Sequence, residues 1–183
     1  VSPVLWNKAF EEKVAADPAS TAIDIALTRM DGTCFRWSGK VLPSSEENDA
    51  LNNLYIERIV KFLLWMKGGY EVVIANAPEL AADLAKIYSP DGARKFDYEI
   101  MGETIYGKTF KITSVALEDA PAENEIQVQL GGHLDGCRIG FDAGGSDRKV
   151  SAVIDGVPVY SEEVVWHPKT QSDPQYQFEG IVD

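Results

Sequence analysis

The sequence has few of the side chains that most often carry metal or redox chemistry. Its 183 residues include two cysteines and two histidines. Cys34 and Cys137 lie far apart, and His133 and His167 have no second ligand at metal-binding spacing. This argues against a zinc site and against a disulfide-stabilised fold. Sparse cysteine of this kind is typical of a reducing compartment, so we expect a cytoplasmic protein.

Positive charge is also scarce. There are 17 Lys and Arg against 29 Asp and Glu, which gives a net charge of -12 at pH 7. A field of this sign repels phosphate backbones and anionic lipid headgroups, so we expect neither nucleic acid nor a membrane surface as a partner. A nucleotide is still compatible with this charge if backbone amides or a metal ion hold its phosphates.

Long hydrophobic runs are missing. The most apolar stretch, residues 51–66, is interrupted by Glu57, Arg58 and Lys61, which is typical of an amphipathic helix rather than a transmembrane span. The first residues contain no apolar segment of signal-peptide length. With 45% hydrophobic and 25% charged residues, the composition is that of a globular protein with a buried core.

The periodicity predicts a mixed α/β (α+β) fold in two parts. We assign residues 1–118 to a small α/β accessory domain and residues 126–183 to a second domain. Residues 119–125, Asp-Ala-Pro-Ala-Glu-Asn-Glu, form the expected linker, because proline, small residues and charges replace the apolar periodicity there. The elements expected in the first domain are a helix over residues 4–16, a hairpin turning at Asp31-Gly32, a helix from the capping sequence 44–47 to Gly68-Gly69, a strand at 72–75, a helix starting at Pro78 and a strand over 109–117.

The long helix of the first domain has an expected buried face. Apolar residues recur along it at helical spacing, and a helix of this kind packs its apolar side against the core. The residues assigned to that face are Leu51, Leu54, Tyr55, Ile59, Phe62, Leu63 and Met66.

The second domain is predicted to be rich in strands. We expect strands over residues 125–130, 138–142, 149–154 and 157–164. Asp155-Gly156 is expected to form a tight hairpin turn, because this dipeptide suits the geometry of a two-residue turn between antiparallel strands. The tail, residues 166–183, is rich in Pro, Gln and Asp, and we expect it to be irregular.

The turn after residue 142 is the segment most indicative of chemistry. A short strand ends in Asp142, and Gly144, Gly145 and Ser146 then lead into a strand running back. Paired glycines let backbone amides point into one concavity and approach an anion closely, and a serine adds a hydroxyl donor. A carboxylate at the strand end can hold Mg²⁺ through its water shell. The pattern therefore favours a phosphate-binding turn over an ordinary hairpin.

Residues 139–146, Ile-Gly-Phe-Asp-Ala-Gly-Gly-Ser, resemble the first phosphate-binding motif of the sugar kinase, Hsp70 and actin superfamily. The match is closest to the ROK family of bacterial glucokinases and repressors, in which Thr usually stands where this chain has Ser146. The resemblance covers about residues 137–165. It implies that the strands of this region are the first three of a ribonuclease-H-like, actin-like ATPase domain.

The resemblance also implies roles for individual residues. Asp142 would face the Mg²⁺ ion of ATP through water, and Gly144, Gly145 and Ser146 would wrap the β- and γ-phosphates. Lys149 is a further candidate for a phosphate contact. The expected activity is Mg²⁺-dependent phosphoryl transfer from ATP to a sugar hydroxyl, as in ROK and hexokinase-like sugar kinases.

Other parts of such a kinase have no counterpart here. The catalytic base, the second phosphate motif, the adenosine motif and the clustered cysteines of the ROK zinc signature are not found in this sequence. We therefore expect the chain to be the N-terminal part of a longer kinase-like protein, with its base beyond residue 183, and to be inactive alone.

Two alternatives from other classes remain open. The hairpin could persist as structure only, in a non-catalytic interaction or regulatory domain. The protein could also be a superfamily ATPase that activates another enzyme. An exposed strand edge in a partial ATPase domain would favour homo-oligomers.

Overall fold

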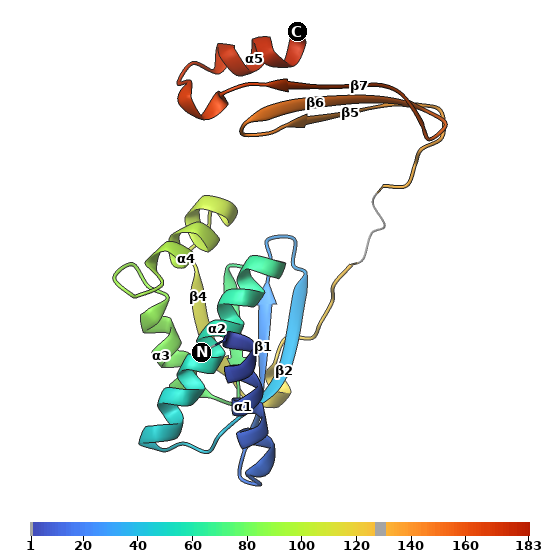
Figure 1. Cartoon of the computed structure of the whole chain (residues 1–183). Helices are drawn as coiled ribbons and strands as arrows, with labels where there is room; N and C mark the ends of the chain where they lie inside the picture. The colour runs from blue at the N-terminus through green and yellow to red at the C-terminus, as the bar shows by residue number, and fades with distance from the viewer. Residues whose placement is uncertain (1, 127–130) are drawn as a thin grey trace. The chain divides into compact units, whose positions relative to one another are not determined.

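The computed structural model describes residues 2–126 and 131–183. It has the mixed α+β fold expected from the sequence. The chain divides into two compact units, unit 1 (Val1–Gln127) and unit 2 (Val128–Asp183) (Figure 1). The strand expected over 125–130 falls mainly on residues 127–130, which lie outside the described residues, and residues 125 and 126 have no regular structure.

Unit 1 is built on a four-stranded sheet of order β2-β1-β3-β4. The inner strand β1 is antiparallel to both β2 and β3, and the second inner strand, β3, is parallel to β4. The strands are β1 (Thr21–Thr28), β2 (Cys34–Val41), β3 (Glu71–Ala75) and β4 (Lys111–Val115). All four were expected from the sequence. Gly32, at the expected hairpin turn, has a φ of 80°, a conformation that glycine adopts without steric cost.

Helices cover one face of this sheet (Figure 1). They are α1 (Pro3–Ala16), α2 (Glu46–Lys67), α3 (Pro78–Ile87) and the short α4 (Lys95–Glu99), which continues into a π-helical turn, η1 (Ile100–Thr104). None of the helices in the described residues combines the length and hydropathy needed to cross a membrane.

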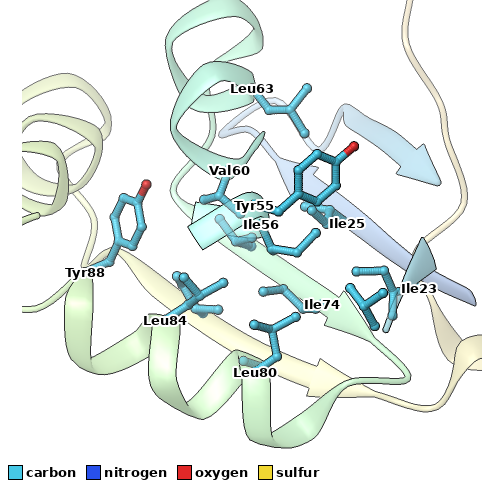
Figure 2. Close-up of a cluster of buried hydrophobic side chains, with 14 of the residues drawn as sticks. Ile23, Ile25, Tyr55, Ile56, Val60, Leu63, Ile74, Leu80, Leu84 and Tyr88 are labelled. Carbon is cyan, nitrogen blue, oxygen red and sulfur yellow. The ribbon is translucent and has the colours of Figure 1, made fainter. Parts of the chain in front are cut away.

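The core of unit 1 lies between the sheet and these helices (Figure 2). Ile23 and Ile25 project from β1 and are at most 1% exposed, while Asp24 between them lies on the second face of the sheet, because successive strand residues point to opposite faces. Ile56 of α2 and Leu84 of α3 complete the contact from the helical side. Full burial of each such side chain contributes about 1.5–3 kcal/mol.

The long helix α2 is rotated relative to the face expected from the sequence. Tyr55 and Leu63 are buried as expected, but Phe62 is 61% and Met66 50% exposed. The residues that α2 buries are Asn52, Tyr55, Ile56, Val60, Leu63 and Leu64. The expected face was wrong because apolar residues almost encircle the last turns of the helix, so their spacing does not fix its orientation. Its N-cap is Ser45, which accepts a hydrogen bond from the amide of Asn48 at 3.2 Å.

The segment expected to be a linker is bonded to unit 1. Residues 117–119 form a short 3-10 turn, η2 (Leu117–Asp119), and residues 120–126 have no regular structure. The amide of Asn124 donates to the carbonyl of Cys34 at 3.0 Å. Glu125 lies 2.9 Å from a guanidinium nitrogen of Arg29 and 2.7 Å from Nζ of Lys67. These contacts hold residues 124 and 125 against β2 and the end of α2.

Unit 2 contains an antiparallel three-stranded meander of order β5-β6-β7. The strands β5 (Cys137–Ala143), β6 (Asp147–Ile154) and β7 (Val157–Val165) confirm the three strands expected in this region. The turn between β6 and β7 is at Asp155-Gly156, with φ values of 47° and 81°. The positive φ at both positions is that of the expected tight hairpin turn.

The tail of the chain is more ordered than the sequence indicated. After β7 it forms a 3-10 turn, η3 (Pro168–Thr170), and a helix, α5 (Pro174–Val182). The side chain of Asp173 accepts a hydrogen bond from the amide of Gln175 at 2.9 Å, and Pro174 occupies the first turn. The expectation of an irregular tail was wrong because this Asp-Pro pair is a helix start, an N-cap followed by a proline that needs no amide partner.

Candidate phosphate-binding site

The turn between β5 and β6 brings together the five residues singled out from the sequence. Gly144, Gly145 and Ser146 connect the two strands. Asp142, the second-last residue of β5, is paired in register with Lys149 of β6. All five therefore lie at one end of the hairpin, and Asp142, Gly145, Ser146 and Lys149 are exposed to solvent.

Glycine is required at position 144 by close packing. A Cβ atom at Gly144 would lie 2.6 Å from the carbonyl oxygen and 2.9 Å from a carboxylate oxygen of Asp147. Neither Gly144 nor Gly145 has a positive φ, so the need at Gly144 is for space and not for an unusual backbone angle. The tight closure keeps three consecutive peptide groups in one short turn.

Trp166 binds the carbonyl side of this turn. Its indole Nε1 donates to the carbonyl of Gly144 at 2.7 Å, and its backbone amide donates to the carbonyl of Ser146 at 3.1 Å. The side chain is 5% exposed and stacks on Tyr176 of α5 with ring centroids 6.3 Å apart. The turn is therefore fixed by the segment after β7 and by α5.

The amides of the turn are not used in hydrogen bonds. Within the described part of the chain, the backbone amides of Gly144, Gly145 and Ser146 donate no hydrogen bond. Consecutive free amides at a tight turn form a concavity that attracts anions. The carbonyls of Gly144 and Ser146 are already bound to Trp166. The turn therefore offers hydrogen-bond donors to a ligand, and these two carbonyls do not compete as acceptors.

The ammonium of Lys149 lies among three carboxylates beside the turn. Nζ of Lys149 lies 3.2 Å from a carboxylate oxygen of Asp147 and 4.0 Å from one of Glu163. The hydrogen bond with Asp147, with the charges of Asp147, Glu163 and Asp142, raises the pKa of the Lys149 ammonium above its ordinary value. Lys149 thus compensates Asp147, and its charge is already engaged in the ligand-free turn.

Lys169, which the sequence reasoning missed, also lies at this turn. A Cβ atom at Gly145 would lie 2.6 Å from Cε and 2.9 Å from Nζ of Lys169. The residue belongs to η3, more than twenty positions beyond the motif. The signal that could have found it is the meander itself, because the end of a third antiparallel strand lies beside the turn that joins the first two.

The residues present fit a water-mediated Mg²⁺ ion better than a site made of protein ligands alone. No group of three or more His, Cys, Asp or Glu side chains within residues 2–126 and 131–183 could hold a metal ion. Asp142 is exposed beside the free amides. Mg²⁺ usually keeps several waters and is bound through one or two carboxylates together with the phosphates of a substrate, an arrangement that needs Asp142 and no further protein ligand.

Comparisons of the chain with protein-family models, with curated proteins and with solved structures gave no match.

Proposed function

We propose that unit 2 binds the phosphates of Mg·ATP at the turn of residues 144–146, and that this chain is the N-terminal part of a ROK or hexokinase-like sugar kinase. The observation that carries the proposal is that the consecutive amides of Gly144, Gly145 and Ser146 donate no hydrogen bond within the described residues, while Trp166 binds the carbonyls of Gly144 and Ser146. The motif in residues 139–146, which includes this turn, supports the same assignment.

Each residue of the turn has a role in this proposal. The three amides and the Ser146 hydroxyl donate hydrogen bonds to phosphate oxygens, and Asp142 accepts from water bound to Mg²⁺. In the transfer step, the oxygen of a sugar hydroxyl bonds to the γ-phosphorus and the bond to the β,γ-bridging oxygen breaks, so that ADP leaves. The hydroxyl proton passes to a base that we place beyond residue 183.

The exposed surface of unit 2 supports its assignment to a larger ATPase domain. All residues of β5 are exposed, and among the described residues no strand pairs with its outer edge. Ile139 is 79% and Phe141 45% exposed on this strand. An uncovered apolar edge strand is a surface that proteins normally cover or pair, and the remaining strands of an actin-like domain would do so here.

Binding of Mg·ATP to the full 183-residue chain tests the phosphate site. We expect addition of Mg·ATP to shift the amide NMR signals of residues 144–147 more than those of unit 1, and the shift to weaken when Mg²⁺ is withheld. Asp142→Asn should lower the affinity for Mg·ATP by about tenfold or more, because the water-mediated hold on the metal is lost. Its affinity for ATP without metal should change little.

Asp135→Asn is the matched control for this experiment. Asp135 is an exposed carboxylate of unit 2 whose only ion pair among the described residues is with Arg138, at 3.4 Å. It should bind Mg·ATP as the unsubstituted chain does. If Mg·ATP leaves the signals of residues 144–147 unchanged, the phosphate site is refuted, and the non-catalytic interaction domain becomes the better account of the hairpin.

A further inference from the structure

Lys169 is placed against the middle residue of the turn. Its Cε and Nζ atoms would lie 2.6 and 2.9 Å from a Cβ atom at Gly145, so the lysine occupies space that any other residue at position 145 would fill. The absence of a side chain at Gly145 therefore does two things at once. It exposes the amide of the turn and it admits the end of a lysine side chain beside it.

The backbone of Lys169 is held in this position. The hydroxyl of Thr170 donates to the carbonyl of His167 at 3.0 Å, and the amide of His167 donates to the hydroxyl of Tyr176 at 2.9 Å. The indole of Trp166 ties the start of the same segment to Gly144. Less conformational entropy is lost on ligand binding when the backbone that carries the binding group is already fixed.

Lys169 also carries a charge that no described residue neutralises. Each ion pair found for a basic residue of unit 2 involves Arg138, Arg148 or Lys149, and within residues 131–183 no carboxylate lies within 4.0 Å of the Lys169 ammonium. Three carboxylates, Asp142, Asp147 and Glu163, surround Lys149 beside the turn, and Lys149 offsets one of them. A second cation at this turn reduces the negative charge that would otherwise repel a polyphosphate.

We propose that Lys169 is a phosphate ligand of this site, and that its ammonium binds the oxygens of a polyphosphate held on the amides of residues 144–146. The proposal rests on the phosphate site put forward above and names one further residue for it. Lysine suits this task because its ammonium is a compact charge on a flexible stem with three donors. It can leave its place over Gly145 and follow the phosphate chain without a change in the backbone.

The test compares two ligands on variants of the full chain. Mg·ATP and inorganic tripolyphosphate with Mg²⁺ are titrated while the amide signals of residues 144–147 are followed. Lys169→Gln should weaken both ligands by about tenfold, because a charge-assisted hydrogen bond to phosphate is lost. The loss should be similar for the two ligands, since the contact is to phosphate and not to adenosine. Lys169→Arg should bind within about threefold of the unsubstituted chain, because the charge is kept.

A second readout separates charge from structure. Lys169→Gln should reduce the dependence of binding on ionic strength, since one fewer charge is screened, while the indole N–H signal of Trp166 should stay in place. Lys108→Gln removes the same charge from unit 1, at an exposed position, and should bind both ligands normally. If the unsubstituted chain binds and Lys169→Gln binds equally well, Lys169 is not a ligand and the phosphate site stands. If the unsubstituted chain shows no shift at residues 144–147, both proposals are overturned.

Discussion

Two glycines of the β5–β6 hairpin face opposite steric conditions. At Gly144 a methyl group would meet the carbonyl oxygen of Asp147 at 2.6 Å, whereas at Gly140 nothing lies within 4 Å of an added Cβ. Gly140 also has no positive φ. Position 144 therefore requires glycine and position 140 does not, although both lie in the same motif.

Gly144→Ala and Gly140→Ala should accordingly have opposite effects. We expect Gly144→Ala to destabilise unit 2 by about 1–3 kcal/mol, because the turn must open to relieve the overlap. Gly140→Ala should be neutral or stabilise β5 by about 0.5–1 kcal/mol, since alanine loses less conformational freedom in a strand than glycine. Amide signals of β5 and β6, followed through a urea series, report both changes. Equal stability of the two variants would contradict the steric account of the turn.

The two lysines at the turn show how far single residues could be predicted. The resemblance to the kinase motif predicts Lys149 as a phosphate contact, and in the structure Lys149 pairs with Asp147 at 3.2 Å. Lys169, which lies against Gly145, stands after the third strand and outside the motif. A short motif contains only residues that are close in sequence. In an antiparallel meander, the end of the third strand also lies beside the turn that joins the first two strands. That contact requires the topology as well as the residue types.

At the scale of elements, α2 provides the sharpest difference between expectation and structure. The position and length of the helix follow from its caps and apolar content, but its rotation does not. Phe62, expected in the core, is 61% exposed, and Ile56, absent from the expected face, is fully buried. The sheet decides the rotation, because the side chains of Ile25 and Ile74 fill one side of the core that the helix must complete (Figure 2).

Truncation of the side chains of Ile56 and Phe62 tests the rotation of α2. Ile56→Ala should destabilise unit 1 by about 2–5 kcal/mol, the cost of a cavity in a packed core. Phe62→Ala should change its stability by less than about 1 kcal/mol, since the ring is largely in solvent. Urea unfolding of the full chain is followed by fluorescence, which three tryptophans of unit 1 dominate. If Phe62→Ala lowered the free energy of unfolding more than Ile56→Ala did, the buried face would be the one expected from the sequence.

The tail shows a different limit of sequence interpretation. Composition alone indicated an irregular segment, yet α5 forms over Pro174–Val182 and its Tyr176 stacks on Trp166. The local start signal at Asp173-Pro174 was present in the sequence. The stabilising contact was not readable there, because a helix this short depends on tertiary packing for most of its stability, and its partner belongs to the segment that follows β7.

At the scale of the whole molecule, the linker expected over residues 119–125 lies within unit 1, whose last residue is Gln127. This segment has more structure than its composition indicates, since Asn124 and Glu125 are bonded to unit 1. Proline and small residues do mark the end of the periodic pattern at residue 119. The ion pairs of Glu125 with Arg29 and Lys67 join positions far apart in the sequence, so no local pattern predicts them.

Glu125 links three parts of unit 1. It accepts hydrogen bonds from Arg29, beside the β1–β2 turn, and from Lys67, at the end of α2. Its side chain is 17% exposed. The hydrogen bond from Lys67 is the largest influence on the Glu125 carboxyl, and with the Arg29 contact it outweighs burial and lowers the pKa below the ordinary value of 4.5. The folded state therefore releases this proton more readily than the unfolded state.

Glu125→Gln should destabilise unit 1 by about 1–2 kcal/mol at neutral pH, because two charge-assisted hydrogen bonds are weakened. A lowered folded pKa means that the contribution is complete above the unfolded pKa and is lost as the pH falls through the folded pKa. The difference between Glu125→Gln and the unsubstituted chain should therefore shrink on acidification below 4.5. Urea unfolding at a series of pH values measures it. Glu123→Gln, at an exposed neighbouring position, should show no such difference. If the stability difference for Glu125→Gln persisted in acid, packing rather than charge would hold this segment.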